Sequence, residues 1–146
     1  MDPGLEASNR VVAVDSSIVG REFPPVGPYL VSAEKVREFA TAIGWPDGLA
    51  AGTVPPTFPI VLAGASMNAF LDELGLELRR IVHGEQRFSY ERAVVPGDEL
   101  TSTLTVASLR QIGGNDIIGT TTAFTDGSGA LVCTATATLV HRGAAA

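Results

Sequence analysis

The sequence contains almost no cysteine, and its single thiol excludes one route to stability. Cys133 is the only cysteine among 146 residues, so the chain cannot form an internal disulfide. A domain of this length buries roughly two thirds of its unfolded surface, so a hydrophobic core can hold it without disulfides or metals. The opening residues lack the charged, then apolar pattern of a secretory signal. We therefore expect one domain in a reducing compartment, the cytoplasm.

Long apolar runs and clusters of positive charge are also missing. The longest apolar stretch, Phe58 to Leu71, is interrupted by Pro59, Ser66 and Asn68. It is shorter than the roughly 18 apolar residues that a membrane span needs. The formal net charge is −6, and no group of Lys and Arg residues with interleaved aromatics occurs. We therefore expect neither a membrane nor a nucleic acid among the partners.

Signals for metals and cofactors are scarce as well. No spacing of His, Cys and carboxylate residues resembles a metal site. Gly113-Gly114 lacks the strand-to-helix context of a dinucleotide-binding loop. The sequence therefore predicts no cofactor and no metal.

Two segments carry the pattern of helices. Ser32 is a candidate N-cap, and residues Ala33 to Ile43 after it have the apolar period of an amphipathic helix. The segment from Thr57 to Leu74 begins with another N-cap candidate and then is apolar on almost every side. Because a helix that is apolar all round must be covered all round, this one is predicted to be central and buried.

The second half of the chain changes to the two-residue period of strands. Prolines between Gly20 and Val31 favour an edge strand and a loop for that earlier segment. The later runs are Ile81 to Val94, Leu100 to Gln111, Asp116 to Phe124 and Ala130 to His141, joined by turns rich in Gly, Asp and Asn. They predict a meander of long antiparallel strands, wrapped around the apolar helix. This α+β arrangement is the hot-dog fold, and its exposed sheet edge favours a dimer.

We expect three segments: a flexible arm over residues 1–17, the hot-dog domain over 18–142, and a disordered tail over 143–146. From about Val19 to Val140 the chain also resembles a known family, in six motifs. They are Val19-Gly-Arg-Glu-Phe-Pro-Pro, Glu34-Lys-Val-Arg-Glu-Phe-Ala, Val54-Pro-Pro-Thr-Phe-Pro, Val82-His-Gly-Glu-Gln-Arg-Phe-Ser-Tyr, Val95-Pro-Gly-Asp-Glu-Leu and Gly114-Asn-Asp-Ile. In this order they resemble the MaoC-like dehydratase N-terminal family, which includes non-catalytic subunits of actinobacterial (3R)-hydroxyacyl-ACP dehydratases.

The resemblance implies a site for an acyl thioester beside the central helix, but an incomplete one. Catalytic relatives carry an Asp and a His in the loop before that helix, in a pattern similar to Gly-Asp-x-Asn-Pro-x-His. This chain has Gly44-Trp-Pro-Asp-Gly there, in a shorter loop, and neither catalytic residue can be carried over. The reaction needs an acid and a base at the α and β carbons, so a partner must supply them.

No residue is therefore predicted to be catalytic, with His83 and Glu85 as the fallback pair. We expect His83 to be the only histidine within the folded core. On a two-residue period, His83 shares a polar face with Glu85 and Arg87, opposite Gln86 and Phe88. The predicted substrate-binding residues are Pro56, Thr57, Phe58, Met67, Phe70 and Gln86.

Three functions remain open at this point. The first is an acyl-binding subunit of a (3R)-hydroxyacyl-ACP or -CoA dehydratase, completed by a MaoC-like partner in a heterodimer. The second is a self-sufficient homodimeric enoyl-CoA hydratase that uses His83. The third is an acyl-binding module that catalyses no reaction, and because fold alone never determines chemistry, the sequence does not decide among them.

Overall fold

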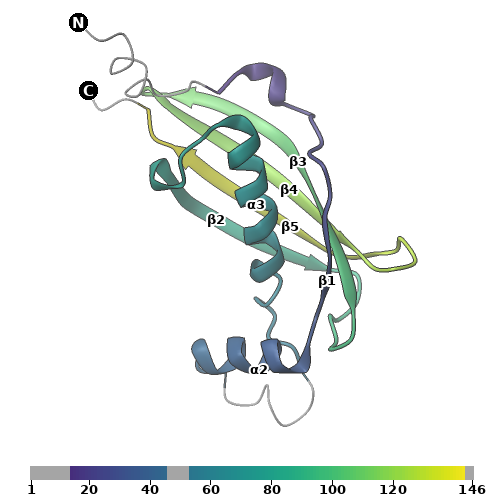
Figure 1. Ribbon diagram of the computed structural model, residues 1–146. Helices are drawn as coiled ribbons and strands as arrows, with labels where there is room; N and C mark the ends of the chain where they lie inside the picture. The colour runs from purple at the N-terminus through teal and green to yellow at the C-terminus, as the bar shows by residue number, and fades with distance from the viewer. Residues whose placement is uncertain (1–13, 46–52, 144–146) are drawn as a thin grey trace, which may run out of the picture.

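One long helix crosses the concave face of a single antiparallel sheet (Figure 1). The computed structural model describes residues 14–45 and 53–143. Its elements are η1 (Ser16–Ile18), β1 (Val26–Leu30), α2 (Ala33–Ala42), α3 (Ile60–Leu74), η2 (Leu78–Arg80), β2 (Ile81–Tyr90), β3 (Glu99–Ile112), β4 (Asn115–Thr125) and β5 (Leu131–His141). No helix in the described part of the chain is long and apolar enough to cross a bilayer. The predicted arm and tail fall largely outside these residues and stay predictions.

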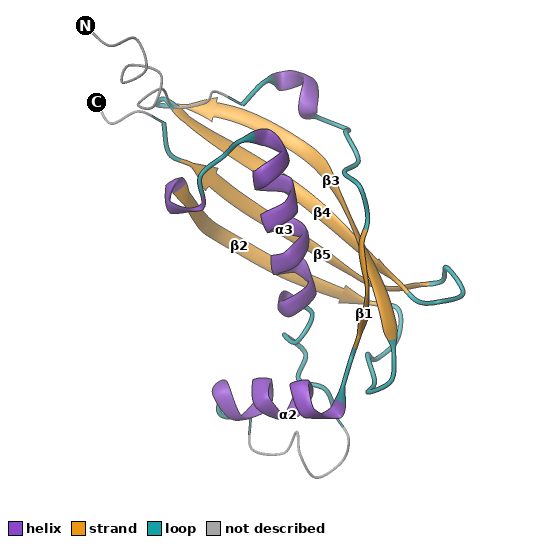
Figure 2. Ribbon diagram, viewed as in Figure 1, coloured by secondary structure: helices purple, strands orange, loops and turns teal. Residues whose placement is uncertain are grey.

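The sheet has the strand order β1-β3-β4-β5-β2, with every neighbouring pair antiparallel (Figure 2). The predicted α+β hot-dog fold is therefore confirmed. The predicted meander is right for β3, β4 and β5 but wrong for β2, which pairs with β5 at the sheet edge. The reason is turn length: Gly113-Gly114 makes a tight hairpin between β3 and β4, whereas residues 91–98 form a longer connection after β2.

The ends of the helices follow from their capping residues. The Ser32 side chain accepts a hydrogen bond from the Lys35 backbone N–H at 3.0 Å, which confirms the predicted cap of α2. The predicted start of α3 at Thr57 is wrong, because the helix begins at Ile60 and Pro59 holds the N-cap position without a side-chain hydrogen bond. The backbone before it forms tighter turns, in which the Ile60 N–H donates to the Thr57 carbonyl.

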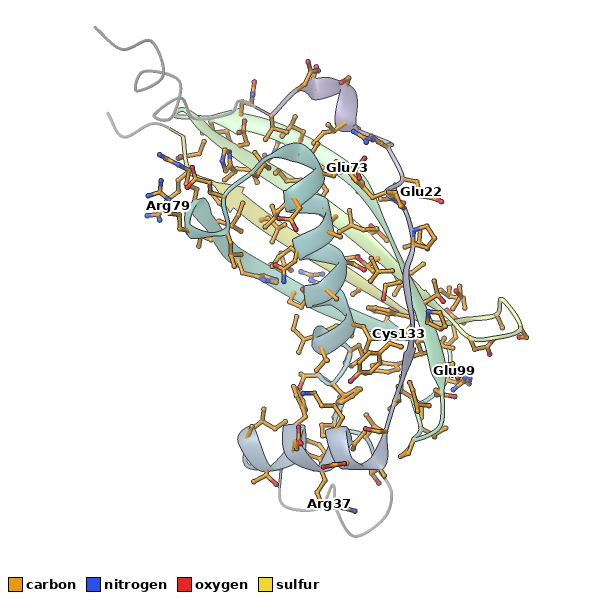
Figure 3. The ribbon with its side chains drawn as sticks, in the orientation of Figure 1. Glu22, Arg37, Glu73, Arg79, Glu99 and Cys133 are labelled. Atoms are coloured by element: carbon orange, nitrogen blue, oxygen red, sulfur yellow. The ribbon has the colours of Figure 1, made fainter. Side chains whose placement is uncertain are left out.

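Two hydrophobic clusters hold α3 against the sheet, one toward each end of the helix. In the first, Phe70 packs edge-on against Phe23 with ring centroids 4.9 Å apart. In the second, Phe58 packs edge-on against Phe39 of α2 with centroids 5.5 Å apart. Glu73, labelled in Figure 3, forms an ion pair with Arg21 and so ties the C-terminal end of α3 to the segment before β1. These contacts fix the position of α3 above the sheet.

A β-bulge in β2 overturns the predicted alternation of its side chains. The register with β5 shifts between His83 and Glu85, so Gly84 is an extra residue that interrupts the two-residue period. Before the bulge Ile81 packs against the first core cluster, and after it Phe88 packs against the second. His83 and Gln86 therefore point to the same side, toward α3, which contradicts the prediction that they lie on opposite faces.

The prediction that His83 is the only core histidine is also wrong. His141, at the end of β5, is 1% exposed, and its Nδ1 lies 3.0 Å from Oδ2 of Asp116 on β4. The other carboxylate oxygen of Asp116 accepts a hydrogen bond from the Gln111 amide at 2.9 Å. That amide also donates to the Val14 carbonyl at 3.3 Å. The pair thus joins three strands to the chain before η1, and the histidine is buried because its polar atoms find partners.

Candidate functional site

A partly enclosed cavity of about 140 Å³ lies between α3 and the sheet. The helix supplies one wall with residues at the spacing of a single helix face. The lining residues are Ile60, Ala63, Gly64, Met67, His83, Gln86, Leu104, Thr120, Thr122, Ala135, Ala137 and Leu139. Most of them are apolar, which suits the hydrocarbon part of a ligand more than a charged group.

The cavity exists because small residues face one another across it. On the sheet side, Thr120 pairs with Ala137 and Thr122 with Ala135, so four small side chains form adjacent rows on β4 and β5. Ala63 and Gly64 face this floor from the helix wall. Protein interiors normally leave few voids larger than a water molecule. The space between these small side chains is therefore larger than core packing usually leaves.

Besides the two threonines of the floor, the lining contains one polar pair. The Nε2 atom of His83 is 2.9 Å from Oε1 of Gln86, and both residues belong to the edge strand β2. The Gln86 amide nitrogen also makes a long contact of 3.4 Å with the Arg87 carbonyl. Since Oε1 can only accept, His83 donates from Nε2 in this arrangement.

The fallback catalytic pair is not brought together. Glu85 forms an ion pair with Arg87 and lines a shallow groove on the outer face of the sheet with Thr136 and Thr138. The bulge at Gly84 separates it from His83, which points to the inner face. The side-chain partner of His83 is thus an amide, and an amide does not exchange protons as a carboxylate does.

The six residues predicted to bind substrate fall in five places. Met67 and Gln86 line the central cavity together with His83. Phe58 and Phe70 are fully buried in the two core clusters, and Thr57 is exposed. Pro56 lines a second cavity at the start of α3. Whether any of the six binds substrate stays a prediction.

The second cavity, of about 480 Å³, lies beside the N-terminal end of α3. Its lining comes from Thr53, Val54 and Pro56 and from the end of β2 with the segment after it, namely Tyr90, Ala93, Val94 and Val95. The Tyr90 hydroxyl donates to the Pro56 carbonyl. Burial raises the pKa of Tyr90 to about 12, so this phenol is a hydrogen-bond donor and not a base near neutral pH.

The buried pair His141 and Asp116 was missed by sequence reasoning, although a signal was present. Counting by twos along β5 from Ala135 through Ala137 and Leu139 reaches His141, so it belongs to the inner face. Neither residue of the pair lines the central cavity. Within residues 14–45 and 53–143, no three His, Cys, Asp or Glu side chains gather as a metal site would require. The predicted absence of a metal stays a prediction.

Comparison with known proteins gives consistent matches over most of the chain. A family model described as the FAS1-like, dehydratase domain region matches residues 17–135. A UPF0336 protein of Clavibacter michiganensis subsp. michiganensis is 46% identical over 144 residues, which cover 89% of this chain and 97% of the relative.

Two solved structures share the fold. A MaoC-like dehydratase superposes with a TM-score of 0.78 at 29% identity, covering 88% of this chain but only 43% of its own. A subunit of the C-terminally truncated HadBC (3R-hydroxyacyl-ACP dehydratase) complex from Mycobacterium tuberculosis superposes with a TM-score of 0.71 at 28% identity, covering 84% of this chain and 96% of its own. The present chain therefore spans less than half of the first structure but nearly the full length of the second.

Proposed function

This chain belongs to the family of the FAS1-like dehydratase domain region, and we propose that it is the acyl-thioester-binding subunit of a (3R)-hydroxyacyl dehydratase or enoyl hydratase. Its resemblance to MaoC-like hot-dog proteins, predicted from six sequence motifs, is confirmed by these matches. The substrate we propose is a fatty-acyl thioester on acyl carrier protein or coenzyme A.

The observation that carries this proposal is the cavity between α3 and the sheet. An acyl chain is a flexible apolar group, and the cavity is lined mainly by apolar side chains that leave about 140 Å³ unfilled. His83 and Gln86 add hydrogen-bonding groups at one side of it. This combination suits an acyl group whose polar end carries a hydroxyl and a thioester carbonyl.

The chemistry of dehydration explains why we propose a subunit and not a complete enzyme. Removal of water needs a base at the α carbon and an acid at the hydroxyl leaving group, commonly a His with a carboxylate. Around this cavity the described residues include His83 but no Asp or Glu. Asp47, the one acid in the shortened loop, lies outside the described residues. We propose that a partner provides the missing pair.

The open edge of the sheet gives such a partner a place to bind. Of the two edge strands, β1 has five residues and contains Pro28, whereas β2 has ten and no proline. A long edge strand without proline presents unpaired backbone groups that can hydrogen-bond to a second sheet. Because His83 and Gln86 lie on β2, a chain paired there would sit beside the cavity and reach it. The HadBC neighbour is itself a complex by its description.

A second candidate is favoured by one specific observation, the position of His83 in the cavity lining. In that case the chain would be a homodimeric hydratase with His83 as its base. The third candidate, an acyl-binding module without a reaction, predicts binding with no activity in any complex.

An assay of enoyl-thioester hydration tests these candidates. The substrates are crotonyl-CoA and crotonyl-ACP, and the purified chain is assayed alone and mixed with a MaoC-like partner that carries Gly-Asp-x-Asn-Pro-x-His. We expect no turnover by the chain alone and turnover in the mixture. Turnover by the chain alone that is lost in His83→Ala but kept in Glu85→Ala, the matched control on the outer face, would establish the second candidate. If the chain binds the thioester but no mixture shows turnover, the third candidate, an acyl-binding module without a reaction, is favoured.

A further inference from the structure

Gly64 lies in the interior of α3, where neither the backbone nor the packing requires a glycine. It sits between Ile60 and Leu74, and its φ is not among the positive values, unlike that of Gly75, which ends the helix at φ 67°. A Cβ atom added at Gly64 would have no other atom within 4 Å, apart from the adjacent residues and the nearby backbone of α3. Glycine in a helix interior destabilises the helix relative to alanine, because it loses more conformational freedom on folding. The fold alone would therefore favour alanine at this position.

The space that the missing side chain leaves is part of the central cavity. Ile60, Ala63, Gly64 and Met67 form the helix wall, and Gly64 lies between the larger residues at its two ends. Opposite, the floor is made of Thr120, Thr122, Ala135 and Ala137. A side chain at Gly64 would project from the wall over this floor and divide the cavity. Its absence keeps the cavity continuous from Ile60 to Met67.

We propose that Gly64 sets the length of the acyl chain that the cavity accepts. This inference rests on the proposed function and deepens it, because it names the residue and the size class of the substrate. A cavity of about 150 Å³ holds a benzene molecule, so the cavity of about 140 Å³ beside α3 corresponds to about six carbon atoms. The acyl group that fits this space is therefore short.

Binding of a series of saturated acyl-CoA thioesters to the purified full chain tests this role. Butyryl-, hexanoyl-, octanoyl- and decanoyl-CoA are titrated by calorimetry into the original chain and into Gly64→Ala, Gly64→Leu and Ala65→Leu. Ala65 is the next residue of α3 and is exposed, so its variant adds the same bulk outside the cavity. Thermal unfolding followed by circular dichroism reports the stability of each variant.

We expect the affinity of the original chain to stop rising at about the hexanoyl length, since the cavity is then full. Gly64→Ala is expected to weaken hexanoyl-CoA binding at least tenfold and butyryl-CoA less, while its melting temperature rises because helix propensity improves. Gly64→Leu is expected to lose both ligands, and Ala65→Leu neither.

Two failures are distinguishable. If the original chain binds none of the four thioesters, the proposed function is wrong and this inference falls with it. If it binds them and both Gly64 variants keep its affinity for every chain length, only the role of Gly64 is refuted. A fall in the melting temperature of Gly64→Ala would separately refute the claim that the glycine is unnecessary for the fold.

Discussion

Replacement of Asp116 by alanine is expected to destabilise the fold strongly, although this residue lies outside the proposed binding site. Its side chain is 9% exposed, and each carboxylate oxygen accepts one hydrogen bond, from His141 at 3.0 Å and from Gln111 at 2.9 Å. Alanine would leave both donors without that acceptor. Gln111 is exposed and keeps the Val14 carbonyl as an acceptor, whereas His141 is 1% exposed and loses the carboxylate. An unsatisfied buried polar group costs about 1 to 3 kcal/mol, so we expect the free energy of unfolding to fall by about that amount.

The lost hydrogen bonds lie where β3, β4 and β5 contact the chain before η1. Since Gln111 also donates to the Val14 carbonyl, loosening its amide also loosens that connection. Asp116→Asn keeps one acceptor oxygen and the shape of the side chain, so it should lose about half as much. Domains of this kind have only about 5 to 15 kcal/mol of stability in total, which makes either effect easy to measure.

Urea unfolding followed by far-ultraviolet circular dichroism provides the measurement, with the slope of free energy against urea expected to stay constant. Glu99, an exposed carboxylate on β3, is the matched control, and Glu99→Ala should change stability by less than about 0.5 kcal/mol. A loss below about 1 kcal/mol in Asp116→Ala would show that water satisfies the two donors and that the pair does not hold the strands together.

Three further predictions concern titratable groups. Burial raises the pKa of the Cys133 thiol from 9.0 to about 11, so we expect no labelling by a disulfide reagent at pH 8 in the folded chain and complete labelling in denaturant. In the unfolded chain the thiol ionises at a lower pH than in the folded chain. The stability of the fold should therefore decrease as pH rises from about 9 toward 11. Hydrogen bonds from Ser128 lower the pKa of Asp126 to about 2, and Ser128→Ala should return it toward 3.8 in an NMR titration; the stability from this carboxylate is present above 3.8 and lost as pH falls toward 2. Tyr90→Phe removes the hydrogen bond to Pro56 and should lower the free energy of unfolding by about 1 kcal/mol. In an ultraviolet titration of the original chain, one phenol should ionise with a pKa of about 12, and this transition should be missing from Tyr90→Phe.

The sequence by itself determined the elements of the fold whose causes are local. The apolar period after Ser32 and the hydroxyl of Ser32 itself account for α2, and the side chain caps the helix as predicted. Alternation and the Gly113-Gly114 turn likewise account for β3 and β4 and for their pairing. These features depend on neighbours within a few residues, so a single sequence is sufficient to read them.

Only the tertiary structure decided how the site is assembled. The strand β2 pairs with β5, far from it in sequence, and the bulge at Gly84 turns His83 and Gln86 to one face while Glu85 goes to the other. Gly84 within the strand was a signal of a bulge, but a two-residue period does not show at which residue the register shifts.

The cavity and the buried pair His141 and Asp116 depend on the same kind of information. The cavity is lined by Gly64, Thr120 and Ala137 only because α3 lies across β4 and β5 at one particular position. A cavity forms between surfaces that come from distant segments, and a buried hydrogen-bonded pair joins atoms of residues far apart in the sequence. Periodicity and capping reveal which face of each element is apolar, whereas packing alone decides which residues meet across the core and where space is left between them.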